Sequence, residues 1–259
     1  MHEKSPHSVV VGIDGSRSAL RAALWAVDEA TDRDVPLRLV SAIDSSESES
    51  AAQAATRDAF AAIESTRKPV KIETEIVYDR PIAALLAESR SAAIVCVGST
   101  GLQHAVHGHI GSTASALISS AHCSVGVVPI TAVPTPVGSV LAVLDESLSD
   151  SAVLELAFRE ARVRAAPLRV LTAAAAARLE RYLALWRRNY PDVDIQPTVR
   201  QGSVVDYLEY LHRTSDPMQL VVVDPGHPGP TDTLLGPSGR AALDAARCTL
   251  LVCGRHRWL

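Results

Sequence analysis

Three glycines followed by two hydroxyl residues form the part of this chain best suited to chemistry. In the stretch GSTGLQHAVHGHIGST, residues 98–113, they are Gly98, Gly101, Gly111, Ser112 and Thr113. Glycines let a backbone approach an anion closely, and the free N–H groups at a helix N-terminus bind phosphate. The stretch lacks the lysine and the spacing of a P-loop. It therefore predicts a phosphate-binding loop made of backbone donors and hydroxyl groups.

Such a loop needs a strand before it and a helix after it, and the sequence predicts both. Gly98 ends an apolar run, and Ser112 begins a segment with apolar residues at helical spacing, at 114, 117, 118 and 121. Apolar runs at 9–13, 37–43, 70–78, 94–97 and 125–128 alternate with helical segments. The first helix repeats its apolar side at Leu20, Ala23, Leu24 and Val27, and the third begins at Pro81. Continuous apolar strands imply burial on both faces, and hence a doubly wound parallel sheet.

The chain then repeats this plan. Residues 25–42 align without a gap on residues 156–173, a shift of 131 that also carries Asp14 onto Asp145. Residues 122–128 match 247–253 at a shift of 125. The apolar runs of the second copy are 140–144, 168–173, 193–199, 220–223 and 250–253. We predict two α/β domains, at 1–130 and 139–259, joined by a Pro-containing linker at 131–138.

Composition excludes several classes of function. The formal charge of −4 and the absence of any run of Lys or Arg argue against nucleic acid and against an anionic membrane surface as partners. The N-terminus turns polar after five apolar positions, which predicts neither a secretory signal nor a membrane span, and favours a cytoplasmic location. The four cysteines lie in or beside apolar runs and have no CxxC spacing, so we expect reduced thiols in the core.

The glycine spacing resembles the nucleotide motif of the universal stress protein family. Gly98, two residues, Gly101, nine residues, Gly111 and Ser112 reproduce it, and VVVGIDGS, VGSTG and HCSVGVVP resemble that family's first, fourth and fifth strands. The resemblance covers nearly the whole chain as a tandem pair. It implies a flavodoxin-like (Rossmann-like) fold with strand order 3-2-1-4-5, binding of ATP with or without Mg²⁺, little or no turnover, and dimers made by the last strand.

The resemblance also assigns roles to single residues. Asp14 would hydrogen-bond the ribose, and the backbone near Gly12 and Ala42 would border the adenine. Ribose and phosphates would be held by Gly98, Gly101, Gly111, Ser112 and Thr113. An acceptor carboxylate directly after the first strand suits ribose hydroxyls. The sequence departs from the family at Asp79, where a Gly-x-Pro is common, so the geometry of that loop is open.

The second copy has lost parts of this motif. Its fourth strand ends in Asp224 where the first copy has Gly98, and Pro237 replaces Ser112. Proline has no N–H to donate, and a carboxylate repels phosphate. We expect the second site to be weak or empty, although Gly226 and Gly236 keep the nine-residue spacing.

Three functions compete at this point. The first is an ATP-binding stress-response regulator, the second a nucleotide-independent interaction scaffold, and the third a slow ATPase. Against the third, no catalytic lysine or Ser/His/Asp constellation can be assigned. His104, His107 and His109 could bind a metal in principle, but a loop without Cys or carboxylate support predicts none. The apolar fifth strands need cover, which pairing of the two copies within one chain or a homodimer would give.

Overall fold

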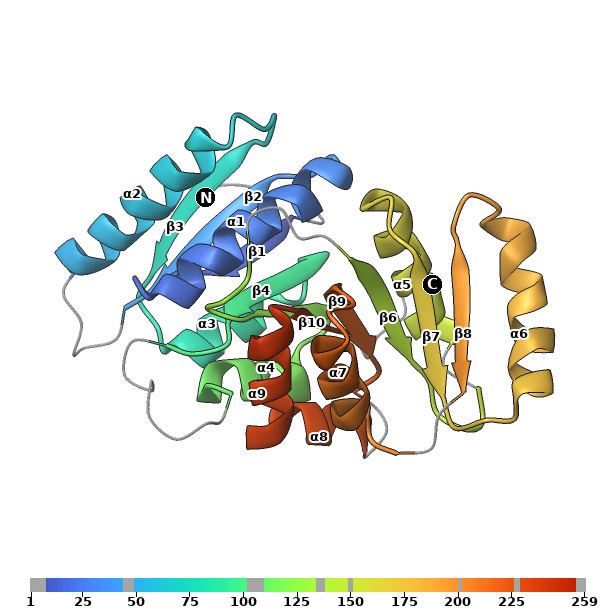
Figure 1. Ribbon diagram of the computed structural model, residues 1–259. Coiled ribbons are helices and arrows are strands. Elements are labelled where there is room, and N and C mark those ends of the chain that lie inside the picture. Colours follow the sequence, from blue (N-terminus) through green and yellow to red (C-terminus); the bar gives the residue numbers. More distant parts are fainter. Residues whose placement is uncertain are drawn as a thin grey trace. The chain divides into compact units, whose positions relative to one another are not determined.

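The computed structural model describes residues 8–43, 49–101, 110–133, 138–148, 151–199, 202–225 and 229–254. The chain divides into two compact units (Figure 1). Domain 1 is Met1–Pro134 with Gly254–Leu259, and domain 2 is Thr135–Cys253. Among the described residues, no helix combines the length and the hydropathy needed to cross a bilayer.

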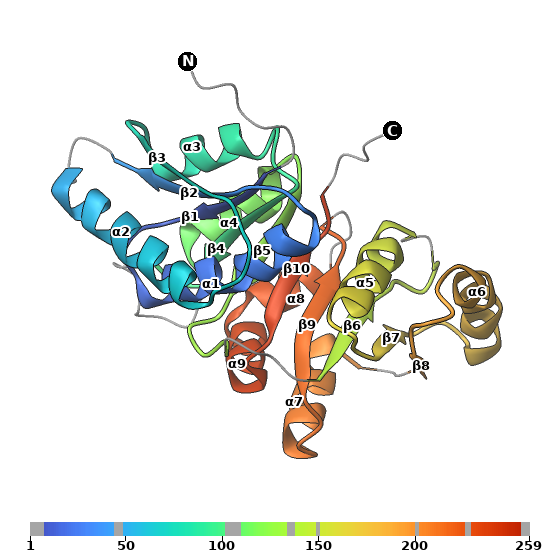
Figure 2. The ribbon, with the colours of Figure 1, turned by 90° about the horizontal axis from the view of Figure 1, so that it is seen from above.

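Domain 1 is a five-stranded parallel sheet in the order β3-β2-β1-β4-β5. Its strands are β1 (Val9–Gly12), β2 (Leu37–Ala42), β3 (Ile72–Val77), β4 (Ile94–Gly98) and β5 (Ser124–Val128). Its helices are α1 (Arg17–Asp32), α2 (Glu49–Ser65), α3 (Pro81–Glu88) and α4 (Ser112–Ser120). Helices α1 and α2 cover one face, and α3 and α4 cover the other (Figure 2). Ser16 caps α1 by accepting from the Ala19 N–H, and Pro81 occupies the first turn of α3, as expected.

Domain 2 repeats the same order as β8-β7-β6-β9-β10. Its strands are β6 (Ser139–Val143), β7 (Leu168–Thr172), β8 (Ile195–Val199), β9 (Met218–Val223) and β10 (Thr249–Val252). Its helices are α5 (Ser151–Val163), α6 (Ala176–Asn189), α7 (Val204–Arg213), α8 (Pro230–Leu235) and α9 (Pro237–Ala246). The predicted fold class, two flavodoxin-like domains of order 3-2-1-4-5, is confirmed. Helix α8 was not foreseen.

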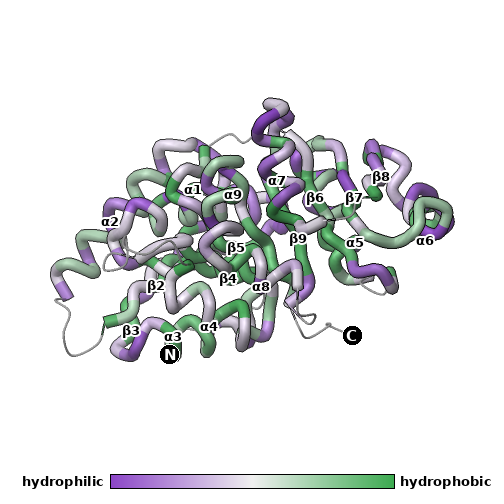
Figure 3. The backbone as a smooth tube through the Cα atoms, turned by 60° about the horizontal axis from the view of Figure 1, so that its bottom comes forward, coloured by the Kyte–Doolittle hydropathy of each residue, from purple (hydrophilic) through white to green (hydrophobic). Residues whose placement is uncertain are grey.

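Buried apolar strands form much of the core of each domain. Most residues of β4 in domain 1 and of β9 in domain 2 are hydrophobic (Figure 3), and β9 is buried throughout. Trp25 of α1 lies against β5 so closely that a Cβ on Gly126 would be 3.0 Å from its ring. In domain 2, Phe158 stacks on Trp186 and Tyr190 at centroid distances of 5.3 and 4.6 Å. Trp25 and Trp186 therefore both pack within their domains.

Two expectations about burial are wrong. The strands β3 and β8 are only partly buried, because each packs mainly against one helix, β3 against α2 and β8 against α6, so the runs 70–78 and 193–199 are not covered on both faces. In α1, Leu20 and Leu24 are half-buried, and the deepest positions are alanines such as Ala22 and Ala26. Small residues let α1 approach the sheet closely. A prediction based on large apolar side chains therefore places the buried face of α1 partly at the wrong positions.

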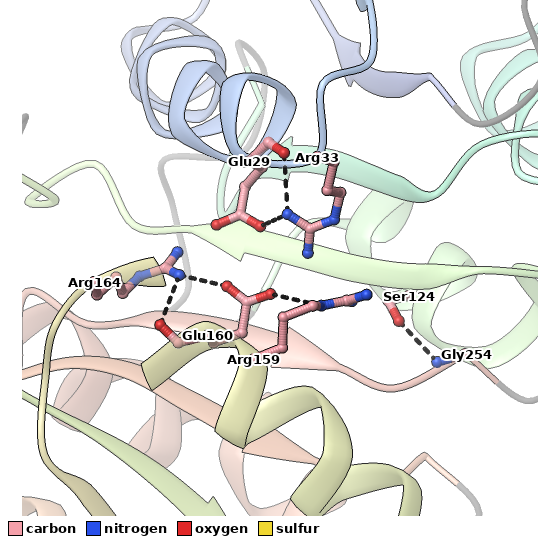
Figure 4. Close-up of polar contacts among 7 residues, drawn as sticks. All are labelled: Glu29, Arg33, Ser124, Arg159, Glu160, Arg164 and Gly254. Atoms are coloured by element: carbon pink, nitrogen blue, oxygen red, sulfur yellow. Dashed lines mark hydrogen bonds and ion pairs between the residues drawn. The ribbon is translucent and has the colours of Figure 1, made fainter. Parts of the chain in front are cut away.

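A Glu–Arg pair recurs at the repeat shift of 131. In domain 1 the Arg33 guanidinium donates to the Glu29 carboxylate at 2.6 Å and to the Glu29 backbone carbonyl at 3.0 Å. In domain 2 Arg164 donates to the carboxylate and carbonyl of Glu160 in the same way (Figure 4). Both glutamates are fully buried. Because a buried charge needs such a partner, the pair fixes the last turn of the first helix in each domain.

The four cysteines are free thiols and are buried, as expected. Burial raises the pKa of Cys123 to about 12 and raises that of Cys248 further above its ordinary value. Since the thiolate is the reactive form, we expect the native protein to resist iodoacetamide at pH 8. Mass spectrometry should find four modified cysteines only after unfolding. Rapid alkylation of Cys123 or Cys248 in the native protein would contradict this.

Candidate functional site

The site lies at the carboxyl ends of β1 and β4, which are neighbours in the sheet of domain 1. The strand order reverses between these two strands, and parallel sheets bind ligands at that point. The turn 13–16 follows β1, and the loop that begins at Ser99 follows β4. The sheet thus brings together Asp14 and Gly101, two predicted site residues far apart in sequence: a Cβ on Gly101 would lie 3.0 Å from the Asp14 Oδ2.

Asp14 is exposed and held in place by its own turn. Its Oδ1 accepts a hydrogen bond of 2.9 Å from the Ser16 N–H, and Gly15 adopts a φ of +81° that favours glycine. Gly15 faces α2, because a Cβ there would lie 3.4 Å from the Ala55 Cβ. The carboxylate is therefore exposed to solvent just beyond the carboxyl end of β1.

Gly98 serves packing. A Cβ at this position would lie 2.6 Å from the Cβ of Ser18, so α1 and the end of β4 can meet only if residue 98 is glycine. The Ser18 hydroxyl donates to the Thr100 carbonyl, and the Ser16 hydroxyl lies 3.5 Å from the same oxygen. Sequence reasoning missed Ser16 and Ser18, and their only signal was their place directly after the Asp-Gly turn.

Gly111 is the N-cap of α4, and Ser112 is the first helical residue. The Gly111 N–H donates to the Ser99 carbonyl at 2.9 Å, which closes the loop between β4 and α4. Gly111 has no side chain with which to cap this helix, and the N–H groups of the first turn of an α-helix have no partner within the helix itself. Ser112 is exposed and Thr113 half-buried. In the loop, the buried Ser99 hydroxyl has no hydrogen-bond partner among the described residues.

Two further predicted residues, Gly12 and Ala42, are the last residues of β1 and β2, at the same end of the sheet. A Cβ on Gly12 would lie 2.9 Å from Leu85 of α3, so this glycine too admits a close helix. Ala42 ends β2 beside Val77 of β3. The histidines His104, His107 and His109 lie outside the described residues. Within the described part of the chain, no group of three or more His, Cys, Asp or Glu could hold a metal ion.

The corresponding region of domain 2 is built differently. Helix α8 follows β9, and the Thr231 hydroxyl donates to the Asp224 carbonyl at 2.7 Å. Gly239 of α9 packs on α8 so tightly that a Cβ would lie 2.6 Å from the Leu234 carbonyl carbon. Pro237 is the first residue of α9. In domain 2, protein groups thus pack closely between the end of β9 and the start of α9.

The turn after β6 in domain 2 is also braced by the protein itself. Arg178 of α6 donates to the carbonyls of Glu146 and Ser147 at 3.1 and 2.7 Å. The Ser147 hydroxyl donates to Asp145, the counterpart of Asp14, at 2.5 Å. A guanidinium therefore lies beside this turn in domain 2.

Comparison with known proteins fits this geometry. The family model described as "Universal stress protein family" matches residues 6–129. Universal stress protein Rv2028c of Mycobacterium tuberculosis is 40% identical over 274 residues, which cover 97% of each chain. The chain belongs to the universal stress protein family. Universal stress protein Rv3134c of the same organism is 45% identical over 240 residues, 84% of this chain and 88% of its own.

The fold is shared with a solved member of the universal stress protein family. The universal stress protein of Archaeoglobus fulgidus DSM 4304 superposes with a TM-score of 0.71, over 96% of this chain and 98% of its own, at 12% sequence identity. Its coverage shows that the tandem arrangement of two flavodoxin-like halves is a fold found in the family. Family membership supports a role in stress response.

Proposed function

We propose that this universal stress protein binds ATP, with or without Mg²⁺, in domain 1, and that nucleotide occupancy regulates its conformation or its choice of partner. One observation carries the proposal: the N-terminus of α4, whose N-cap Gly111 makes no side-chain hydrogen bond, follows the glycine loop after β4, and Asp14 approaches that loop at Gly101. Backbone donors and the helix dipole favour phosphate there, and an acceptor carboxylate suits a ribose.

The donor set fits the nucleotide. Gly98, Gly101, Ser112 and Thr113 supply backbone N–H groups and hydroxyls for phosphate and ribose oxygens, and Gly111, whose N–H bonds the Ser99 carbonyl, leaves room for the phosphates. The buried Ser99 hydroxyl, which lacks a partner in the described structure, could donate to the same ligand. Gly12 and Ala42 border the place for the base. If Mg²⁺ accompanies the nucleotide, its ligands come mainly from the phosphates and water.

One nucleotide per chain is the expected stoichiometry. In domain 2, Asp224 and Pro237 remove a donor and add a negative charge, and α8 packs against α9 beside them. One charge-assisted hydrogen bond is worth about 1.5–3 kcal/mol, or roughly ten- to hundredfold in affinity. Titration calorimetry with ATP should therefore give a single site. Two equivalent sites per chain would contradict the assignment to domain 1.

Phosphate release separates binding from catalysis. The loop has no lysine to stabilise charge on a transferring phosphoryl group, and we assign no residue to orient a water, so multiple-turnover hydrolysis should stay near background. Robust hydrolysis that a single substitution in the loop eliminates would favour the ATPase instead. If no nucleotide copurifies and ATP does not bind, the scaffold function is the better account.

Assembly is a separate proposal, and it rests on the sequence. The fifth strands, SVGVVP and TLLVC, are short and apolar, and an uncovered apolar edge strand promotes aggregation. We propose that the two copies pair through them within the chain, with a homodimer as the alternative. Sedimentation at several protein concentrations distinguishes a monomer from a dimer.

A further inference from the structure

One aromatic side chain near the carboxyl ends of the strands of domain 1 is largely exposed to solvent. Tyr78 follows β3 directly and is 72% exposed, the highest value among the large apolar and aromatic side chains that the structure describes as exposed. An aromatic ring gains free energy by leaving water, so a ring left in solvent at a ligand edge is available for a partner. The exposed tyrosine in domain 2, Tyr210, is by contrast 43% exposed and stacks on Tyr207.

The strand register places Tyr78 next to the expected position of the base. Val77 is the partner of Ala42, and its carbonyl accepts the Ile43 N–H at 2.8 Å. Tyr78 is therefore the first residue beyond the point where Ala42 ends β2. The contact of the phenol with Glu49, the first residue of α2, orients the ring, and this hydrogen bond raises the pKa of Tyr78.

Alternation along β3 shows on which face of the sheet the ring lies. Glu73 and Glu75 both reach Arg38, which also bonds Glu88 of α3, so odd-numbered residues of β3 face α3. Successive side chains of a strand alternate, so the even-numbered residues of β3 lie on the opposite face, where α2 packs. The contact of Tyr78 with Glu49 of α2 puts its ring on that side as well. The turn that carries Asp14 approaches α2 as well, through Gly15 and Ala55. Asp14 and Tyr78 therefore lie on the same face of the sheet, the face on which α2 packs, beyond the carboxyl ends of β1 and β3.

The order of the strands matches the order of the groups in a nucleotide. The phosphate loop follows β4, Asp14 follows β1, Ala42 ends β2 and Tyr78 follows β3, and these four strands are successive neighbours. Strands lie about 4.8 Å apart, so a ligand that spans β4 to β3 extends about 14 Å. Phosphates over β4 and ribose at β1 direct the base toward β2 and β3.

We propose that Tyr78 is a base-contacting residue that stacks on the purine ring of the bound nucleotide, with Glu49 as the positioning residue that holds the phenol. This inference rests on the proposed function. It adds a contact that depends on the base and is independent of the phosphate donors. Base–aromatic stacking should strengthen nucleotide binding roughly five- to 150-fold.

Calorimetry on the full chain tests the contact with two probes, ATP and inorganic tripolyphosphate. Tyr78→Ala should weaken ATP binding by roughly five- to 150-fold and leave the affinity for tripolyphosphate unchanged. Tyr78→Phe keeps the ring and should retain most of the ATP affinity. Tyr210→Ala is the matched control, an exposed tyrosine removed from domain 2, and should leave both affinities unchanged.

The outcomes separate this inference from the proposed function. If the parent protein binds ATP and Tyr78→Ala binds it equally well, the base contact is refuted while nucleotide binding stands. Equal loss of ATP and tripolyphosphate affinity in Tyr78→Ala would also refute it, because the residue would then act through the loop. If the parent protein fails to bind ATP, the proposed function falls, and the base contact falls with it.

Discussion

Replacing Gly111 with valine is expected to abolish ATP binding and to leave domain 1 folded. Gly111 has φ −58° and ψ 151°, which any residue can adopt, and the atoms nearest to a Cβ there would be the Ser99 carbonyl oxygen at 3.6 Å and the Gly101 N and Thr100 Cα at 3.8 Å, ordinary contact distances. The branched side chain therefore fits the protein but projects over the backbone donors of the loop. A steric block of this kind removes the space that phosphates need.

Asp14→Ala provides the graded comparison. It should remove one or two ribose hydrogen bonds of about 1 kcal/mol each and weaken ATP binding roughly five- to thirtyfold. Calorimetry should rank the parent above Asp14→Ala and Asp14→Ala above Gly111→Val, with unchanged circular dichroism for all three. Gly111→Val with the affinity of the parent protein would show that the phosphates lie elsewhere. Gly98→Val is no substitute, because it collides with Ser18 and perturbs the fold itself.

Removing Arg38 is expected to cost about 3–5 kcal/mol of folding free energy. Arg38 lies in β2, is 5% exposed, and donates to the carboxylate of Glu88 at 2.5 Å, while Glu88 itself is 3% exposed. Arg38→Met preserves most of the side-chain volume but removes the Arg38 guanidinium from the buried Glu88 carboxylate. Breaking a buried pair by deleting one partner is far more costly than replacing both partners.

Urea denaturation of a matched set of variants measures this loss. Arg38→Met should show the full loss, and Arg38→Met combined with Glu88→Leu should recover a large part of it because no buried charge remains. Arg90→Met, at an exposed arginine in the same domain, should change stability by less than about 0.5 kcal/mol. If the double variant were as unstable as the single one, the cost would come from lost packing, and the buried charge would not explain it.

The fold could be predicted from the sequence because its signals are local and repeated. Apolar runs marked all ten strands to within a few residues, and the shift of 131 between the two copies carried the topology from one half to the other. The burial of β3 and β8 was overestimated because an apolar run does not reveal whether helices cover one face of a strand or both. Helix α8 was missed because six residues that begin with proline give too short a periodicity.

The roles of single site residues were harder to predict from the sequence than the position of the site in the sheet. The glycine spacing indicated a loop, but it could not separate Gly98, which admits Ser18 of α1, from Gly111, which caps α4. That distinction depends on contacts between residues about 80 positions apart. Ser18 and Tyr78 stayed unnoticed for the same reason, since nothing in their immediate sequence shows what they face.

The tight packing of α8 on α9 determines which substitutions domain 2 would need in order to adopt the architecture of domain 1. Reverting Asp224 to glycine and Pro237 to serine would restore the letters of the motif, yet α8 would still lie against Gly239, where a single Cβ has no room. Arg178 would still hold the turn beside Asp145 through Glu146 and Ser147. Several changes would have to occur together, and the intermediates would carry an ill-fitting helix. Single substitutions are therefore not expected to give domain 2 the architecture of domain 1.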